Sequence, residues 1–119
     1  MKEFRAFRVR SENNKIIGRV EKLNIDALSQ GDVVIKTAYS SVNYKDALAG
    51  TGTLKLIHKF PRVIGINVSG NVVSSSDKRF KDGDAVLVTG YEFGIGHDGG
   101  FSEYCRVPAD WVVPLPDKM

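Results

Sequence analysis

The sequence is poor in cysteine, in histidine and in long apolar runs. Its 119 residues include one cysteine, Cys105, and two histidines. A single cysteine excludes an internal disulfide and a thiolate-rich structural zinc site, and it agrees with a reducing compartment. No apolar run approaches the roughly 20 residues that span a bilayer, and the first residues lack the apolar segment of a secretory signal. These absences predict a soluble, cytoplasmic protein without a membrane partner.

A large excess of charge of one sign is also lacking. The chain has 17 basic and 14 acidic residues, a net charge of +3, and the two signs are mixed along its length. This positive balance is weak evidence for nucleic-acid binding, because a phosphorylated cofactor or a thioester of a nucleotide carrier would be attracted in the same way. With 42% hydrophobic residues, the chain can bury the core of one small domain.

The opening segment alternates in the manner of a β-strand. Phe7 and Val9 alternate with Arg8 and Arg10, and from Ala6 onward this period of two predicts one buried apolar face and one solvated charged face. A polar turn and a second apolar run at 16–20 follow. The two runs are therefore expected to form a hairpin.

Short apolar and β-branched runs recur as far as the end of the chain. The runs expected to form strands are 33–39, 63–73, 85–89, 101–107 and 112–115, with a turn at 108–111. The first of them is expected to be a central strand. Gly65 and Gly70 permit a bend or a close backbone approach within their run, as a small curved barrel requires. Many short strands with one brief helix predict a β-barrel or a β-sandwich.

Reactive side chains gather where the run 33–39 passes into a short helix-like segment. Asn43 can cap this helix, because its side-chain oxygen can accept a backbone N–H, and Asp46 favours the positive end of the helix. A sharper interpretation places Tyr44 and Lys45 at the rim of a cleft, where the ammonium group would favour the phenolate. Adjacent helical residues diverge by about 100°, so these two are not the Tyr-x-x-x-Lys pair of reductases. On spacing alone, capping and packing are favoured over catalysis.

Other chemistries find little support in the sequence. Catalytic zinc requires three convergent ligands, and the candidates His58, His97 and Cys105 do not cluster. A loop histidine such as His97 is expected to be solvated, and a strand cysteine such as Cys105 is expected to pack in the core. The glycines from Gly94 to Gly99 match Gly-x-Gly-x-x-Gly, but a strand-like run follows them where a phosphate-binding loop would open a helix.

Four motifs, in this order along the chain, resemble those of one enzyme superfamily. They are Val42-Asn43-Tyr44-Lys45-Asp46-Ala47-Leu48-Ala49, Gly65-Ile66-x-Val68-Ser69-Gly70-x-Val72, Phe80-Lys81-x-Gly83-Asp84-x-Val86 and Gly99-Gly100-Phe101-Ser102-Glu103-Tyr104. The chain resembles the zinc-free medium-chain dehydrogenase/reductases, and within them the quinone oxidoreductase branch that includes acryloyl-CoA reductases. The likeness extends over residues 1–116, and the Asn-Tyr-Lys-Asp stretch is its most specific part.

This resemblance implies a mainly β fold, a GroES-like, partly open β-barrel with one or two short helices. Residues 1–119 would form only the substrate-side domain, and the Rossmann domain that binds most of the cofactor would be absent. NADPH would deliver hydride to a quinone, an enone or an acryloyl-CoA-type substrate in the cleft between the two domains. The full-length enzyme would be a homodimer, and the isolated fragment would be inactive.

The resemblance also implies which residues form the site. Tyr44 and Asn43 match catalytic positions that line the family's cleft, where they could orient or polarise a substrate carbonyl, and Lys45 is a weaker addition to the binding residues. Where the family commonly has Pro-Gly-Ile-Asp, this chain has Ile-Gly-Ile-Asn at 64–67, so a rigid turn and a carboxylate are absent. The zinc-bearing branch would place ligands near Asn43 or Tyr44 and near Ile66 or Asn67. None of these residues can replace the customary thiolate or imidazole, so no zinc is expected.

A non-enzymatic β-barrel is the competing interpretation. It would be either a co-chaperonin-like ring or a small basic module that binds single-stranded nucleic acid. For the second possibility, Phe4 lies in phase with Arg8 and Arg10 and offers one aromatic beside a cationic strand face. One aromatic is too few for a row of stacking platforms, so a small-molecule reductase without a nucleic-acid partner is preferred.

Overall fold

The computed structural model describes residues 3–13, 15–40, 60–90 and 93–115. The strands in these ranges are β1 (Phe4–Glu12), β2 (Lys15–Leu23), β3 (Val33–Tyr39), β4 (Arg62–Val63), β5 (Asn67–Ser75), β6 (Ala85–Thr89), β7 (Tyr104–Val107) and β8 (Val112–Pro114). Two short 3₁₀ helices accompany them, η1 (Ile25–Ala27) and η2 (Ala109–Trp111). The helix expected to begin at Asn43 lies outside the described residues.

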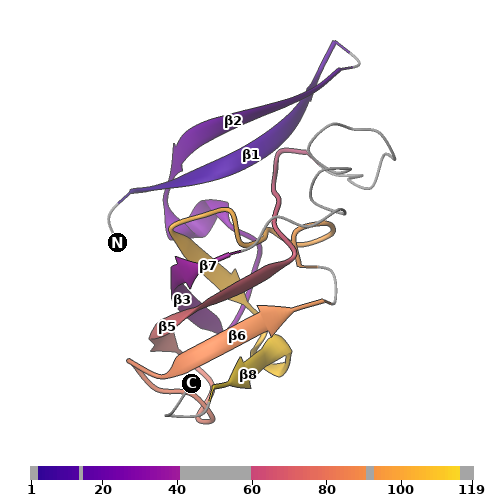
Figure 1. Ribbon diagram of the computed structural model, residues 1–119. Helices are drawn as coiled ribbons and strands as arrows, with labels where there is room; N and C mark the ends of the chain where they lie inside the picture. The colour runs from indigo at the N-terminus through magenta and orange to yellow at the C-terminus, as the bar shows by residue number, and fades with distance from the viewer. Residues whose placement is uncertain (1–2, 14, 41–59, 91–92, 116–119) are drawn as a thin grey trace.

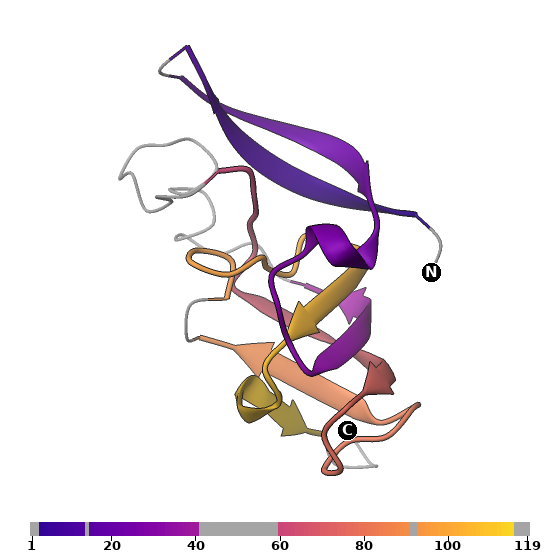
Figure 2. The same cartoon turned by 180° about the vertical axis from the view of Figure 1, so that it is seen from behind.

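The strands form two antiparallel sheets, with the β1–β2 hairpin standing above the larger sheet in Figure 1 and seen from behind in Figure 2. The first sheet has the strand order β2-β1-β4, and the second has the order β7-β3-β5-β6-β8. β3 is paired on both sides, as expected of a central strand. The mainly β class predicted from the sequence is therefore confirmed, as is the hairpin.

A short segment before β7 bridges the two sheets. The amide of Phe7 in β1 donates to the carbonyl of Phe101 (2.7 Å), and the amide of Glu103 donates to the carbonyl of Arg5 (2.9 Å). The carbonyl of Glu103 in turn accepts a hydrogen bond from the amide of Thr37 in β3 (2.9 Å). The hydrogen-bonded backbone thus continues from one sheet to the other along this side of the barrel.

The larger sheet buries one face, because successive side chains of a strand point to opposite faces, and burial alternates along β5, β6 and β7. Ile35 of β3, Val72 of β5 and Val86 of β6 are buried together in this core. Cys105 of β7 lies in the same core, and burial raises the pKa of its thiol to about 12. The predicted packing role of this cysteine is confirmed, and a thiol with so high a pKa is not a nucleophile at neutral pH.

The glycine at position 70 lets β3 and β5 approach closely. A Cβ atom on Gly70 would collide with the backbone carbonyl oxygen of Lys36. The ladder between the two strands also shifts register twice, which is typical of a bent sheet. The close backbone approach predicted for this glycine is confirmed.

The β1–β2 hairpin buries a different face at each of its ends. Near the start of β1 the buried side chains are Phe4 and Ala6, and further along the buried side chain is Val9. The phase predicted from Ala6 onward therefore holds at Val9 but is wrong at Ala6, which is buried, and Phe7 is only half-buried. Phe4 is 3% exposed and packs against Tyr104, with 5.4 Å between the ring centroids. It is not available to stack on bases.

The arginines of β1 form ion pairs rather than a purely solvated cationic face. Glu21 on β2 accepts hydrogen bonds from Arg10 at 2.6 and 2.8 Å and from Arg8 at 3.3 Å. The bond from Arg10 is the main cause that lowers the pKa of Glu21 from 4.5 to about 2, and the bond from Arg8 adds to it. One carboxylate thus ties both arginines to the neighbouring strand.

We expect the substitution Glu21→Gln to remove part of the acid sensitivity of folding. Because the folded-state pKa is depressed, ionised Glu21 stabilises the fold above about pH 4.5, and this stabilisation is lost as the pH falls towards 2. The free energies of unfolding of the wild-type and Glu21→Gln proteins, measured in urea, should differ by an amount that shrinks over this interval. The other carboxylates titrate in both proteins, so their contributions cancel in this difference. A difference that does not depend on pH would contradict the ion pair.

Two smaller sequence expectations are corrected by the structure. The run 101–107 forms a strand only over Tyr104–Val107, because its earlier part is the segment that bridges the sheets. The expected turn at 108–111 contains the one-turn helix η2.

Strand β7, not a helix, follows the glycine-rich loop, so the rejection of a phosphate-binding loop is confirmed. None of the helices described is long and apolar enough to cross a membrane.

Candidate functional site

Two clefts meet at Ser40, the residue that follows β3. The larger, which we call the hairpin cleft, has a volume of about 660 Å³ and lies between the β1–β2 hairpin and residues 100–103. The smaller, the sheet cleft, has a volume of about 340 Å³ and lies over β3, β5 and β6. The predicted site residues Asn43, Tyr44 and Lys45 follow Ser40 closely in the sequence. They lie outside the described residues, so their roles remain predictions.

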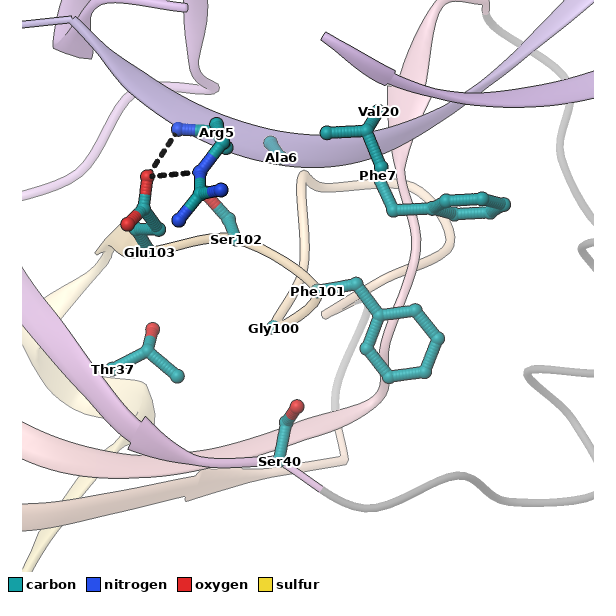
Figure 3. Close-up of a pocket in the computed structure, with 10 residues that line it drawn as sticks. All are labelled: Arg5, Ala6, Phe7, Val20, Thr37, Ser40, Gly100, Phe101, Ser102 and Glu103. Atoms are coloured by element: carbon teal, nitrogen blue, oxygen red, sulfur yellow. Dashed lines mark hydrogen bonds and ion pairs between the residues drawn. The ribbon is translucent and has the colours of Figure 1, made fainter. Parts of the chain in front are cut away.

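The hairpin cleft has a largely apolar lining. Phe7 and Val20 come from the hairpin, and Phe101 lies opposite them on the segment that bridges the sheets (Figure 3). Thr37 and Ser102 add hydroxyl groups, and the Ser102 hydroxyl donates to a backbone carbonyl (2.7 Å). The cleft therefore suits an apolar group that enters from solvent.

An ion pair lies at one end of the hairpin cleft. Glu103 accepts hydrogen bonds from the backbone amide of Arg5 (2.6 Å) and from its Nε (3.4 Å), as Figure 3 shows. These two bonds lower the pKa of Glu103. A carboxyl group with a lowered pKa is ionised at neutral pH, so Glu103 neutralises Arg5 and does not serve as a general acid.

The sheet cleft carries small polar groups on an apolar floor. Hydroxyls come from Ser40, Ser69 and Thr89, an amide comes from Asn67, and Leu87 is part of the floor. Hydroxyl and amide groups can both donate to and accept from a carbonyl or a carboxamide. Among the described residues that line this cleft there is no carboxylate, histidine or amine. These residues can orient a ligand, but they supply no general base.

A buried polar cluster holds the loop that leads to the wall of the hairpin cleft. Asp98 accepts hydrogen bonds from the amide of Val63 (2.9 Å) and from the amide and hydroxyl of Ser29 (2.9 and 3.1 Å). Arg62 donates to the Ser29 hydroxyl (3.0 Å) and lies 3.4 Å from Asp98. This cluster could not be predicted from the sequence, because Ser29 and Asp98 are 69 residues apart and no local pattern marks a buried carboxylate.

His97 is buried, which corrects the expectation that it is solvated. Its Nε2 donates to the carbonyl oxygen of Arg106 (2.7 Å), and its ring centroid lies 4.9 Å from that of Trp111. Burial lowers the pKa of His97, so the ring is neutral at pH 7. Within the described ranges, no three acidic, histidine or cysteine side chains come together as metal ligands. His58 lies outside those ranges.

Known proteins with similar sequences are oxidoreductases by name. Residues 29–117 match the profile of the alcohol dehydrogenase GroES-like domain. The chain is 42% identical over 116 residues to a Bacillus subtilis protein named as a quinone oxidoreductase, YhfP, and 43% identical over 108 residues to the acrylyl-CoA reductase AcuI of Ruegeria pomeroyi. These alignments cover 98% and 91% of this chain, but only 35% and 33% of the two relatives.

Two solved structures that resemble this chain are also oxidoreductases of greater length. The YhdH oxidoreductase of Salmonella enterica in complex with NADP is 42% identical, with a TM-score of 0.93 over 97% of this chain and 36% of that one. YhfP of Bacillus subtilis with NAD bound also gives 42% and 0.93, over 100% of this chain and 36% of that one. This chain thus spans about a third of the length of the relatives it matches. Together with the two antiparallel sheets, the profile match shows that the chain belongs to the family of alcohol dehydrogenase GroES-like domains.

Proposed function

We propose that this chain is the substrate-side domain of an NADPH-dependent oxidoreductase that reduces a quinone, an enone or an acryloyl-CoA-type thioester. One observation carries the proposal: Ser40, where two clefts meet, leads directly into the Asn-Tyr-Lys-Asp stretch typical of the quinone oxidoreductase branch. The relatives that match nearly the whole chain include an acrylyl-CoA reductase and an oxidoreductase solved with NADP. They support the reaction class, and experiment must choose the substrate.

The length of the chain allows the proposed site residues to reach the clefts. An extended chain spans at most about 3.6 Å per residue, which limits the separation of the Asn43 and Ser40 Cα atoms to about 11 Å. The same limit for Tyr44 is about 14 Å. The proposal requires both side chains to reach a ligand in the sheet cleft, and these limits permit it.

The proposed roles follow from the charge that develops during reduction. NADPH, when bound, supplies the hydride. The Asn43 amide and the Tyr44 hydroxyl would donate hydrogen bonds to the substrate carbonyl oxygen, where negative charge accumulates as hydride reaches the β-carbon. Lys45 would add positive charge nearby, as a weaker contribution.

The sheet cleft fits the polar edge of such a ligand. The hydroxyls of Ser40 and Thr89 and the amide of Asn67 can bond to a substrate carbonyl or to a nicotinamide carboxamide. Zinc independence belongs to the same proposal. The positions at which a zinc enzyme requires thiolate or imidazole ligands fall near Asn43 or Tyr44 and near Ile66 or Asn67, and none of these residues supplies such a ligand.

A full-length protein that contains this domain is the material for the test. We expect loss of NADPH absorbance on addition of acryloyl-CoA or a quinone, with no added zinc and no effect of a chelator. The same assay with NADH in place of NADPH determines which of the two cofactors the enzyme uses. The 119-residue chain alone is expected to be inactive, since most of the cofactor-binding surface would lie elsewhere. Absence of turnover with a quinone, an enone and acryloyl-CoA would contradict the proposal.

Light scattering of the same protein separates the reductase from a co-chaperonin-like ring. The reductase is expected to be a dimer, whereas a ring would appear as a heptamer-sized species. The nucleic-acid alternative has lost its aromatic platform, because Phe4 is buried, and Arg8 and Arg10 are already bound by Glu21.

A further inference from the structure

Strand β2 forms the outer edge of the three-stranded sheet. In the part of the chain that the structure describes, β2 pairs with β1 on one side and with no strand on the other. It is nine residues long, and Figure 1 shows it along the outside of the molecule. A long open edge is a place at which an extended chain can add as a further strand.

The backbone of β2 directs hydrogen-bonding groups to its open side at Val20 and Lys22. In an antiparallel ladder, each residue directs its N–H and C=O to one neighbouring strand. Phe7 and Arg5, the register partners of these two residues, bond instead to the segment that bridges the sheets. Val20 and Lys22 therefore occupy non-hydrogen-bonded pairs, and their backbone groups point outward.

The hairpin cleft opens beside this edge. Val20 lines the cleft and is 66% exposed. The Phe7 ring packs over Gly18, where an added Cβ would collide with it, and Figure 3 shows this ring turned away from Val20. An apolar side chain that enters the cleft would therefore cover apolar surface that the domain itself leaves exposed.

Positive charge lies two residues along the same edge. Lys22 is exposed and stands directly opposite Arg5 in the register, and like charges in that position repel each other. Glu103 neutralises Arg5, so the net charge of these three groups is positive. A carboxylate placed over Lys22 would offset this positive charge.

We propose that the edge of β2 and the hairpin cleft together bind an extended, acidic segment of another polypeptide. The segment pairs antiparallel with Val20 and Lys22. It places a carboxylate over Lys22 and, two residues later, an apolar side chain in the cleft beside Val20. The backbone bonds supply affinity and the alternate side chains supply specificity. This binding surface goes beyond the proposed reductase function and does not depend on it.

A second copy of this chain suits the edge less well. β2 carries Lys15, Arg19 and Lys22. Arg19 pairs with Glu12 (3.1 Å), and the one acidic residue of the strand, Glu21, already binds Arg8 and Arg10. Two β2 edges paired antiparallel would bring together two predominantly cationic strands. Charge complementarity therefore favours an acidic partner.

Peptide binding to the full-length protein tests the proposal. The probe is a fluorescent, end-blocked peptide, Thr-Asp-Thr-Val-Thr-Thr, in which the acidic and apolar residues are two apart. We expect saturable binding by fluorescence polarisation, and hydrogen-exchange protection centred on β2 (Lys15–Leu23). The same peptide with lysine in place of aspartate should bind at least tenfold more weakly.

Two kinds of variant separate edge pairing from non-specific attraction. Lys22→Glu should weaken binding at least fivefold, whereas Lys78→Glu makes the same charge change on an exposed lysine between β5 and β6 and should change binding less than twofold. Within the peptide, N-methylation of aspartate or valine removes an N–H that faces β2 and should abolish binding. N-methylation of the threonine between them should be tolerated, because its N–H points away.

Several outcomes would overturn the proposal. They are no binding at millimolar peptide, equal binding of the lysine peptide, tolerance of all N-methyl groups, or protection that lies outside β2. Protection of β2 that rises with protein concentration in the absence of peptide would assign the edge to a second copy of the chain, and would overturn the proposal as well.

Discussion

Replacing Asp98 by alanine is expected to destabilise the fold by about 3–5 kcal/mol, the usual cost of removing one partner of a buried ion pair. Asp98 is 6% exposed and accepts hydrogen bonds from Val63 and Ser29. The substitution would leave Arg62 buried without its carboxylate, and the Nε of that arginine already has no hydrogen-bond partner. Both effects act in the same direction, because a buried polar group without a partner keeps its desolvation cost.

Urea unfolding of the Asp98→Ala protein measures this loss, and Asp110→Ala provides the control. Asp110 also pairs with an arginine, Arg79 at 2.8 Å, but its side chain is 84% exposed. Exposed ion pairs contribute little to stability, so the control should unfold close to the wild-type midpoint. Equal midpoints for the two variants would show that the buried cluster does not hold the glycine-rich loop.

The substitution Tyr44→Phe is expected to reduce kcat/KM of the full-length enzyme about 100-fold with acryloyl-CoA. This is the usual effect of removing one hydrogen-bond donor from a developing oxyanion, and it follows from the role proposed for the Tyr44 hydroxyl. Steady-state NADPH oxidation measures it. Because phenylalanine keeps the ring, folding should be unchanged, and the unfolding midpoint of the variant verifies this.

Tyr104→Phe is the matched control for Tyr44→Phe. Tyr104 lies in β7, packs against the ring of Phe4 and lines neither cleft. Its hydroxyl has no proposed role in the reaction, so its removal should leave kcat/KM within about twofold of wild type. Full activity in Tyr44→Phe would eliminate the catalytic role of the hydroxyl and leave Tyr44 as a residue of the cleft rim.

Local patterns predicted most of the strands correctly. Alternation and a polar turn identified the hairpin, apolar and β-branched runs identified strands of the larger sheet, and Gly70 marked a close backbone approach that the structure contains. The burial of Cys105 also followed from its strand context. In each case the signal lies within a few residues of sequence, so a single chain is enough to read it.

The errors share a physical cause. A period of two shows that faces alternate, but it cannot show that a twisted hairpin changes its buried face along its length, as Phe4 and Val9 do. The burial of His97 depends on Trp111 and on the carbonyl of Arg106. Contacts between distant segments leave no local pattern.

The site residues stay a prediction. The sequence motif led to Asn43, Tyr44 and Lys45, which lie outside the described residues, and Ser40, three residues before Asn43, is where two clefts meet. The clefts themselves could not be predicted, because they depend on how the hairpin stands over the larger sheet. The open edge at Val20 is likewise a property of the assembled sheets.

The destination of the hydride tests the central claim most directly. Full-length protein would turn over acryloyl-CoA with NADPH that carries deuterium at C4 of the nicotinamide, and mass spectrometry would locate the label in propionyl-CoA. We predict one deuterium at the β-carbon, with the α-carbon proton taken from solvent. Two results would contradict hydride transfer at this site. One is deuterium at the β-carbon that comes from heavy water, and the other is an unlabelled product with both stereoisomers of the C4-deuterated cofactor.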